Sequence, residues 1–268
     1  LSGTSAVEIP VNPVCRVCGE ATHSFGEALL LAKHRVHYFE CDVCGYVQTE
    51  DPYWLEEAYQ NPVNLTDTGL LRRNVMLSRM TLLLLRRYFK KGDFVLDYSG
   101  GYGVLTRLLR DAGAECYWHD PYTPNVFARG FEMHRAARSF SLVTSFESFE
   151  HFVYPLEEIR KISQISSEIF FSTRLLPPHR PQPGQWWYYG LEHGQHIGFF
   201  TPASLAHIAK ELGLHVVSAF GAYHFLSRRK IHPLSFAVTL AFSRTPFVSL
   251  FHPGPSLTVR DSEFLSRI

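Results

Sequence analysis

The sequence lacks an excess of charge of either sign. It contains 26 Lys plus Arg against 25 Asp plus Glu, which gives a formal net charge of +1. Proteins that bind nucleic acid generally need a basic surface to neutralise phosphates, and this composition provides no such surface over the chain as a whole. We therefore expect no nucleic-acid partner.

Long apolar runs are also missing. No uninterrupted stretch reaches the roughly 18 residues that a membrane-spanning helix requires, and the chain does not open with the charged, apolar and small-residue pattern of a secretory signal. We therefore expect a cytoplasmic protein. The 268 residues exceed the roughly 100 to 200 of a typical domain, and a hydrophobic content of 46% is sufficient for a large core.

Cysteine is scarce but concentrated, because four of the five cysteines lie in the first 44 residues. They form the pairs Cys15-x-x-Cys18 and Cys41-x-x-Cys44, and a glycine follows each pair. Two such knuckles can bring four thiolates to one tetrahedron, which suits a structural Zn²⁺ ion with no open coordination position. Disulfides or redox thiols are the alternative, which a cytosolic chain disfavours. We expect the fifth cysteine, Cys116, in the packed core.

The stretch from Asp93 to Asp120 has the order strand, glycine turn, helix, strand, acid. Residues 94–96 are an apolar run of strand length, and residues 99–103 supply a turn in which glycines let the backbone approach a ligand. Apolar residues then recur at helical spacing over 104–112, and 116–118 form the second strand. This order predicts the first half of a doubly wound nucleotide-binding sheet.

The turn reads D-Y-S-G-G-Y-G, with an acid before it. Asp97 would repel a pyrophosphate but suits a cationic ligand group, and Asp120 can accept hydrogen bonds from ribose hydroxyls. This combination resembles motifs I and II of the class I S-adenosylmethionine (SAM) methyltransferases, whose usual form is D-x-G-x-G-x-G. Ser99 replaces the first glycine, and we expect it to fit the turn with a negative φ. The resemblance implies a SAM site built from Asp97, Tyr98, Ser99, Gly100, Gly101, Gly103, Asp120, Pro121, Phe146 and Glu147.

The remaining pattern completes the predicted fold. We expect a covering helix over 70–89, a poorly marked third strand within 127–133, a fourth strand over 141–146, a helix over 155–165, a fifth strand over 169–173 and a final antiparallel pair over 215–220 and 223–227. The predicted fold class is α/β: a doubly wound, Rossmann-like, seven-stranded sheet with a small N-terminal zinc ribbon. The predicted domains are the zinc ribbon over 1–60, the SAM-dependent methyltransferase domain over 61–227 and a C-terminal extension over 228–268.

Two segments allow more than one interpretation. The aromatic run 186–189 leads through 190–200 into a helix that starts at Thr201 as N-cap and Pro202 as first residue. It is either part of the acceptor site or an aromatic plug over the sheet edge. The apolar segment 234–251 is either a docking helix or dimer contact, or a membrane-surface element; its prolines and lack of a Lys-rich face favour the first.

The four-cysteine ribbon, V-L-D-Y-S-G-G-Y-G, H-D-P-Y, S-F-E-S-F-E-H and G-Q-H-I-G-F-F-T together look like bacterial zinc-ribbon methyltransferases related to deoxysugar C-methyltransferases. The resemblance implies methyl transfer from SAM to a sugar or other polar small molecule, including nucleotide-linked or lipid-linked sugars as acceptors. The chain departs from the sugar C-methyltransferases: because only about 40 residues follow the last predicted strand, we expect it to lack their large C-terminal domain. An RNA-modifying methyltransferase and a SAM-binding protein without transfer activity remain alternatives.

Two histidines are candidates for removing the acceptor's proton. In the sugar C-methyltransferases the matching segment is E-H-x-x-Y-F, whereas this chain has Gln195-His196-Ile197-Gly198-Phe199-Phe200, so an amide replaces the glutamate. The resemblance therefore favours O-methylation of a hydroxyl, with His196 as general base, Gln195 orienting the acceptor and His151 assisting. The alternatives are C-methylation, and a His196 that only caps the loop by hydrogen bonding.

Overall fold

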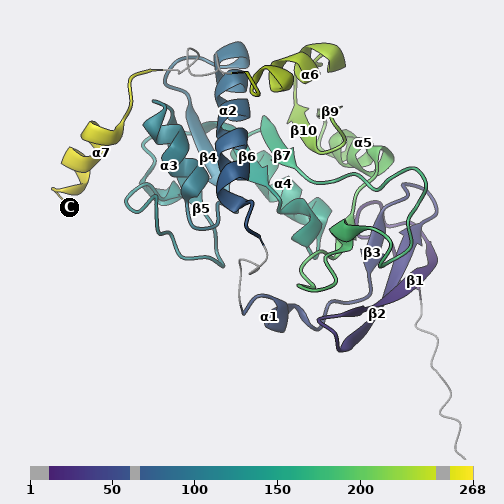
Figure 1. Ribbon diagram of the computed structural model, residues 1–268. Coiled ribbons are helices and arrows are strands. Elements are labelled where there is room, and N and C mark those ends of the chain that lie inside the picture. The colour runs from purple at the N-terminus through teal and green to yellow at the C-terminus, as the bar shows by residue number, and fades with distance from the viewer. Residues whose placement is uncertain (1–11, 61–66, 246–253, 268) are drawn as a thin grey trace, which may run out of the picture.

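The computed structural model describes residues 12–60, 67–245 and 254–267, and it has the predicted α/β fold (Figure 1). Its central sheet contains β4 (Phe94–Tyr98), β5 (Glu115–His119), β6 (Phe140–Phe146), β7 (Ile169–Ser172), β9 (His215–Ala219) and β10 (Tyr223–Ser227). The strand order is β5-β4-β6-β7-β10-β9. The first four strands run parallel, whereas β10 is antiparallel to both of its neighbours. The carboxyl ends of β4 to β7 therefore share one edge.

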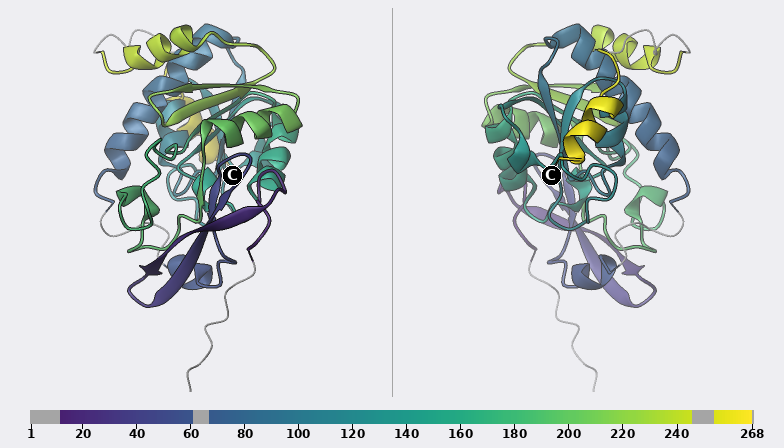
Figure 2. Two further views of the ribbon diagram at one scale, coloured as in Figure 1. Left: turned by 90° about the vertical axis from the view of Figure 1, so that its right-hand side faces the viewer. Right: turned by 90° about the vertical axis from the view of Figure 1, so that its left-hand side faces the viewer.

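Helices cover both faces of this sheet (Figure 2). Successive strand residues alternate between the two faces: Val95 packs with α2 (Leu70–Tyr88), α3 (Val104–Asp111) and α6 (Pro233–Phe242), whereas Leu96 packs with α4 (Pro155–Ile165) and α5 (Pro202–Glu211). The near-continuous apolar runs of the strands follow from this double burial. Thr201 caps α5 as predicted, since its side chain accepts a hydrogen bond from the backbone amide of Ser204.

The sheet has six strands in the described part of the chain, so the expectation of a seventh strand was wrong. The segment predicted as the third strand, 127–133, contains only one bridge, between Trp118 and Glu132. It is followed by the short helix η1 (Met133–Arg135). The side-chain Oε1 of Glu132 accepts hydrogen bonds from the side chain of Asn125 and from the backbone amide of Gly130, so this amide is used in a local turn and not in a strand ladder.

A second, antiparallel sheet contains the cysteine-rich segment. It consists of β1 (Thr22–Leu30), β2 (His34–Cys41), β3 (Val47–Thr49) and β8 (Gly198–Phe199), in that order, and the short helix α1 (Leu55–Ala58) follows it. The strand β8 belongs to the segment that follows the aromatic run, and it pairs with β3 through Val47 and Phe199. The sheet of the predicted ribbon over 1–60 is thus completed by a strand from the segment predicted as the methyltransferase domain.

The C-terminal extension docks on the central domain. Helix α6 buries Phe236 and Leu240 in the core with α2, as expected for a docking helix; residues 246–251 of the same predicted segment lie outside the described residues. Helix α7 (Thr258–Leu265) is attached by Asp261, which accepts hydrogen bonds from the buried guanidinium of Arg110 at 2.6 and 2.8 Å. Within the described ranges, no helix combines the length and the apolar character needed to cross a membrane.

Candidate active site

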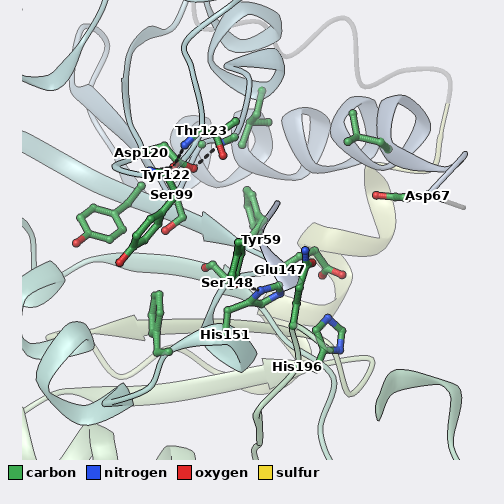
Figure 3. A pocket seen from close by; sticks show the side chains of 18 of the residues that line it. Tyr59, Asp67, Ser99, Asp120, Tyr122, Thr123, Glu147, Ser148, His151 and His196 are labelled. Carbon is green, nitrogen blue, oxygen red and sulfur yellow. Dashed lines mark hydrogen bonds between the residues drawn. The ribbon is translucent and has the colours of Figure 1, made fainter. Parts of the chain in front are cut away.

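A pocket of about 1180 Å³ opens at the carboxyl edge of the parallel strands (Figure 3). Three loops at this edge line it: the turn after β4, the loop after β5, and the segment after β6 that includes the short helix η2 (Phe149–His151); residues of α1, α2 and the segment 187–196 complete the wall. Its lining includes all but one of the predicted catalytic and cofactor-binding residues: Asp97, Tyr98, Ser99, Gly100, Gly101, Asp120, Pro121, Phe146, Glu147, His151, Gln195 and His196. Gly103 does not line the pocket; it is the N-cap residue of α3, with φ of 84°.

The turn after β4 differs from the expectation in one respect. Ser99 has a positive φ of 58°, so the prediction that its φ stays negative was wrong. A left-handed conformation costs a non-glycine residue about 1 to 2 kcal/mol, and such strain concentrates at functional sites. Gly100 is required by space, because a Cβ atom there would lie 2.8 Å from Oδ2 of Asp97 and 2.8 Å from the Trp118 ring. The turn thus keeps the backbone close to the pocket at the expense of local strain.

Asp97 lies at the end of β4 and is 2% exposed. Its carboxylate accepts hydrogen bonds from the hydroxyls of Thr106 at 3.0 Å and Thr144 at 3.3 Å. Burial raises the pKa of Asp97 to about 7, although both hydroxyl hydrogen bonds act in the opposite direction. A cation bound in front of this carboxylate would favour its ionised form.

Asp120 follows β5 and organises the loop beside the turn. Its Oδ2 accepts from the amide of Gly101 at 2.9 Å, and its Oδ1 accepts from the amides of Tyr122 and Thr123 at 2.8 and 2.9 Å. Each carboxylate oxygen can accept more than one hydrogen bond, so Oδ2 retains capacity for a ligand hydroxyl. The carboxylate therefore both closes the loop and faces the cavity, as Figure 3 shows.

The two histidines meet at the other end of the pocket, with ring centroids 4.9 Å apart. Nδ1 of His196 lies 2.6 Å from the carbonyl oxygen of Tyr188, so Nδ1 carries the proton and Nε2 keeps its lone pair. Nδ1 of His151 lies 2.6 Å from the hydroxyl of Tyr59. Burial lowers the pKa of His151 to about 3, and burial together with the nearby His151 and His193 holds the pKa of His196 well below its usual value. Both rings are therefore neutral at neutral pH.

Gln195 is 6% exposed and is engaged in the wall of the pocket. Its side-chain amide nitrogen donates to the carbonyl of Ala58 at 2.9 Å, and its backbone amide donates to Nδ1 of His193 at 3.1 Å. These contacts hold α1 and the histidine segment together. That Gln195 orients the acceptor stays a prediction.

Sequence reasoning missed the residues that hold the histidines. Tyr188, in the short helix η3 (Trp187–Tyr189), donates its hydroxyl hydrogen to the fully buried Glu150 and accepts from the amide of Arg174 at 3.0 Å. Burial raises the pKa of Glu150 to about 8. Glu150 belongs to the segment S-F-E-S-F-E-H and Tyr188 to the aromatic run 186–189, but no pattern in the sequence indicated that these two side chains meet.

The rim of the pocket carries further side chains. Trp187 is 71% exposed, and the guanidinium of Arg174 lies 5.8 Å from its ring centroid. Arg73 also lines the pocket, and its guanidinium donates two hydrogen bonds to the carboxylate of Asp67 at 2.7 and 3.0 Å. Within the aromatic run, Tyr188 and Tyr189 are buried and Trp187 lines the pocket; that the run contributes to the acceptor site stays a prediction.

The four clustered cysteines converge between the segment before β1 and the turn that joins β2 to β3. All four sulfur atoms lie within 4.8 Å of one another, and none forms a disulfide. The closest pairs are Cys18 with Cys41 at 3.3 Å and Cys15 with Cys44 at 3.6 Å. Tetrahedral zinc with Zn–S bonds of about 2.3 Å places sulfur atoms about 3.8 Å apart, so the four side chains fit that ion. Backbone amides of Val17 and Val43 point to two of the sulfurs at 3.4 Å.

The fold and this pocket define an α/β protein that binds its ligand at the carboxyl edge of a parallel sheet. The family model described as a methyltransferase domain matches residues 71–219 of the 268. Because the match covers more than half of the chain, the chain belongs to this family, and it is a SAM-dependent methyltransferase.

Known structures with a similar chain fold are distant. A chain of the complex between the Haloferax volcanii Trm112 methyltransferase activator and the putative methyltransferase is 15% identical, with 67% of this chain and 97% of that chain covered and a TM-score of 0.44. The mitomycin 7-O-methyltransferase MmcR is 13% identical, with 66% and 60% covered and a TM-score of 0.42. A putative methyltransferase from Bacillus halodurans is 12% identical, with 51% and 69% covered and a TM-score of 0.38. No curated protein matches the sequence.

Proposed function

We propose that this methyltransferase transfers the methyl group of SAM to a hydroxyl group of a sugar or another polar small molecule. The observation that carries the proposal is the single pocket lined both by the turn after β4 and by the two histidines. Its volume of about 1180 Å³ exceeds the roughly 300 to 1,000 Å³ of a typical small-molecule site, which leaves room for a donor and an acceptor together.

SAM would lie along the carboxyl ends of β4, β5 and β6. The ribose hydroxyls would donate to Asp120, the glycine turn would approach the methionine part, and Asp97 would be the buried carboxylate nearest to the cationic groups. A cationic ligand matches Asp97, because burial raises the pKa of this carboxyl group to about 7 and a cation bound beside it would favour the ionised form. The side chain of Glu147, which lines the pocket, would contact the adenosine part of SAM.

The acceptor would bind against the part of the pocket wall formed by His151 and His196, near Trp187 at the rim. Nε2 of His196 would take the proton of the acceptor hydroxyl as the oxygen attacks the sulfonium methyl group. Since the carbonyl of Tyr188 holds the Nδ1 proton, His196 is kept in the tautomer that this step requires. His151 would assist from the opposite side, and Gln195 would hold the segment that carries the base.

A zinc ion would bind to Cys15, Cys18, Cys41 and Cys44. Four thiolates leave no position for water or substrate, so the ion would be structural. It would fix the segment before β1 to the turn between β2 and β3 and, through β3, would support the strand β8.

The proposal is tested with radiolabelled SAM and a panel of nucleotide-linked and free sugars. The His196→Ala variant should lower kcat by about 10² to 10⁴-fold, while SAM affinity measured by calorimetry stays unchanged. Substitution of His207, which lies away from the pocket in α5, provides a control of the same type and should keep full activity. A fully active His196→Ala enzyme would contradict the role of His196. A product whose new methyl group is bound to carbon by NMR would show C-methylation instead.

A further inference from the structure

Three side chains that can bind metals converge at the pocket wall that contains the two histidines. One carboxylate oxygen of Glu150 and one ring nitrogen each of His151 and His196 lie within 4.8 Å of one another. This group is separate in sequence and in chemistry from the four cysteines, since it offers one oxygen and two nitrogen atoms. Two imidazoles and a carboxylate suit divalent transition ions such as Ni²⁺, Co²⁺ and Zn²⁺ better than Mg²⁺ or Ca²⁺.

Glu150 supplies an independent indication of a ligand. Its side chain is fully buried, and its Oε2 has no hydrogen-bond partner among the described residues, while its other oxygen accepts from Tyr188. A buried carboxylate oxygen without a partner is costly, and a bound cation would remove that cost.

Both histidines already have the second contact that metal-binding histidines usually need. Nδ1 of His196 is held by the carbonyl of Tyr188, and Nδ1 of His151 is held by the hydroxyl of Tyr59, both at 2.6 Å. Neither Nε2 atom has a hydrogen-bond partner among the described residues. The rings are therefore oriented with their Nε2 atoms available, as in many histidine metal sites. Their burial also favours the neutral form that binds metals.

We propose that Glu150, His151 and His196 form a site for a divalent transition-metal ion, and that an ion bound there blocks methyl transfer. The ion would occupy Nε2 of His196, which is then unable to accept the proton of the acceptor. The open coordination positions would face the pocket, because His151 and His196 line it. Only the blocking effect rests on the proposed role of His196 as base; the binding site does not.

Binding is tested first, with protein whose cysteine cluster has been loaded with zinc. Calorimetric titration with Ni²⁺ should show one further ion per chain. Titration with Co²⁺ should give weak visible absorption bands without the intense sulfur-to-cobalt bands of a thiolate site. Glu150→Gln should weaken Ni²⁺ binding by at least about tenfold. Glu192→Gln is the matched control, because Glu192 is exposed at the same pocket and is not one of the three ligands. It should bind Ni²⁺ like the wild type.

Because Glu150 is fully buried, its substitution can also impair folding. His151→Gln is therefore a second variant, and circular dichroism should confirm the native fold of each protein before titration. Absence of any ion beyond the zinc, or equal Ni²⁺ binding by wild type, Glu150→Gln and His151→Gln, would overturn the proposed site.

Inhibition is measured separately, with the zinc-loaded enzyme and any acceptor that it methylates. Added Ni²⁺ should abolish turnover, and dilution should restore it. Faster turnover with Ni²⁺ would overturn the blocking effect and assign removal of the acceptor's proton to the metal. If no acceptor is methylated, the proposed function fails, while the binding titration still decides whether the metal site exists.

Discussion

Asp97 gives a test of the site that needs no knowledge of the acceptor. Its folded pKa of about 7 lies above the ordinary value of 3.8 because the side chain is buried. Between these pH values the folded protein holds a proton that the unfolded chain has lost, so the stability of the ligand-free protein falls as pH rises from about 4 to about 7. The full difference corresponds to about 4 kcal/mol, as an order of magnitude.

Asp97→Asn removes this charge while keeping the shape of the side chain. The asparagine oxygen can still accept from Thr106, but its amide group gains no acceptor, which costs about 1 to 3 kcal/mol. We therefore expect the variant to be more stable than the wild type by about 1 to 3 kcal/mol at pH 8 in the absence of ligand, and to lose this advantage near pH 4. Urea denaturation of both proteins at the two pH values measures the difference in the free energy of unfolding between variant and wild type. The other titrating groups are the same in both proteins, so their contributions cancel.

SAM binding should respond in the opposite direction. A cation favours ionised Asp97, so wild-type affinity should rise with pH up to about 7 and then level off. Asp97→Asn should bind SAM about tenfold more weakly at pH 8, with little pH dependence, because it cannot become charged.

Asp261→Asn serves as a control because the pKa of Asp261 is shifted in the opposite direction to that of Asp97. Burial raises the pKa of Asp261, but the hydrogen bonds from Arg110 and Arg107 outweigh burial and hold it below the usual value. Removing its charge takes away the closest charged partner of the buried Arg110, whose Nη1 keeps only the carboxylate of Glu115 at 3.6 Å, so the change should cost up to about 3 to 5 kcal/mol at pH 8. If Asp97→Asn were also destabilised at pH 8, with a stability difference independent of pH, the burial argument for Asp97 would be refuted.

Three other substitutions test the remaining parts of the site. Cys41→Ser should lower the zinc content and reduce the free energy of unfolding by several kcal/mol, as judged by metal analysis and denaturation; unchanged zinc would contradict the proposed ligand set. Asp120→Ala should weaken SAM binding by about tenfold or more in calorimetry, with Asp120→Asn as a control that keeps an acceptor for the loop amides; parental affinity in Asp120→Ala would reject the ribose contact. Gly100→Ala should destabilise the protein by about 1 to 3 kcal/mol, because the added Cβ would collide with the Trp118 ring. Gly69→Ala is the control and should be tolerated, because its added Cβ would lie 3.7 Å from the nearest atom. Equal stability of the two variants would contradict the close approach of Gly100 to Trp118.

The parts of the fold that were predictable depend on short segments. Apolar runs and helical spacing specify β4, α3, β6 and α4 locally, because each must bury one or two faces. The absence of a regular third strand over the described residues 127–133 could not be predicted this way, since it depends on local turns such as the one in which the backbone amide of Gly130 donates to the side chain of Glu132. The positive φ of Ser99 was also beyond local reasoning, because the surrounding turn imposes it against the preference of serine.

The contacts that build the site are mostly long-range. Gln195 reaches the carbonyl of Ala58 across 137 positions of the sequence, and Tyr59 reaches His151 across 92 positions. Motif resemblance selected the residues at strand ends, where a topology rule applies. It gave no information about Tyr59, since an isolated tyrosine after a short helix carries no recognisable pattern.

The segment that carries His196 lies between the two sheets, and this gives the cysteine-rich unit a role in the site. The carbonyl of the next residue, Ile197, accepts from the amide of Thr49 at 3.0 Å, and β8 then pairs with β3. A few residues later the hydroxyl of Thr201 donates to the carbonyl of Cys44 at 2.6 Å. Because the segment of the proposed base is joined to the second sheet on both sides of β8, we expect its position relative to the donor pocket to depend on an ordered four-cysteine cluster. The cluster would then support the geometry of the proposed methyl transfer, although none of its cysteines lines the pocket.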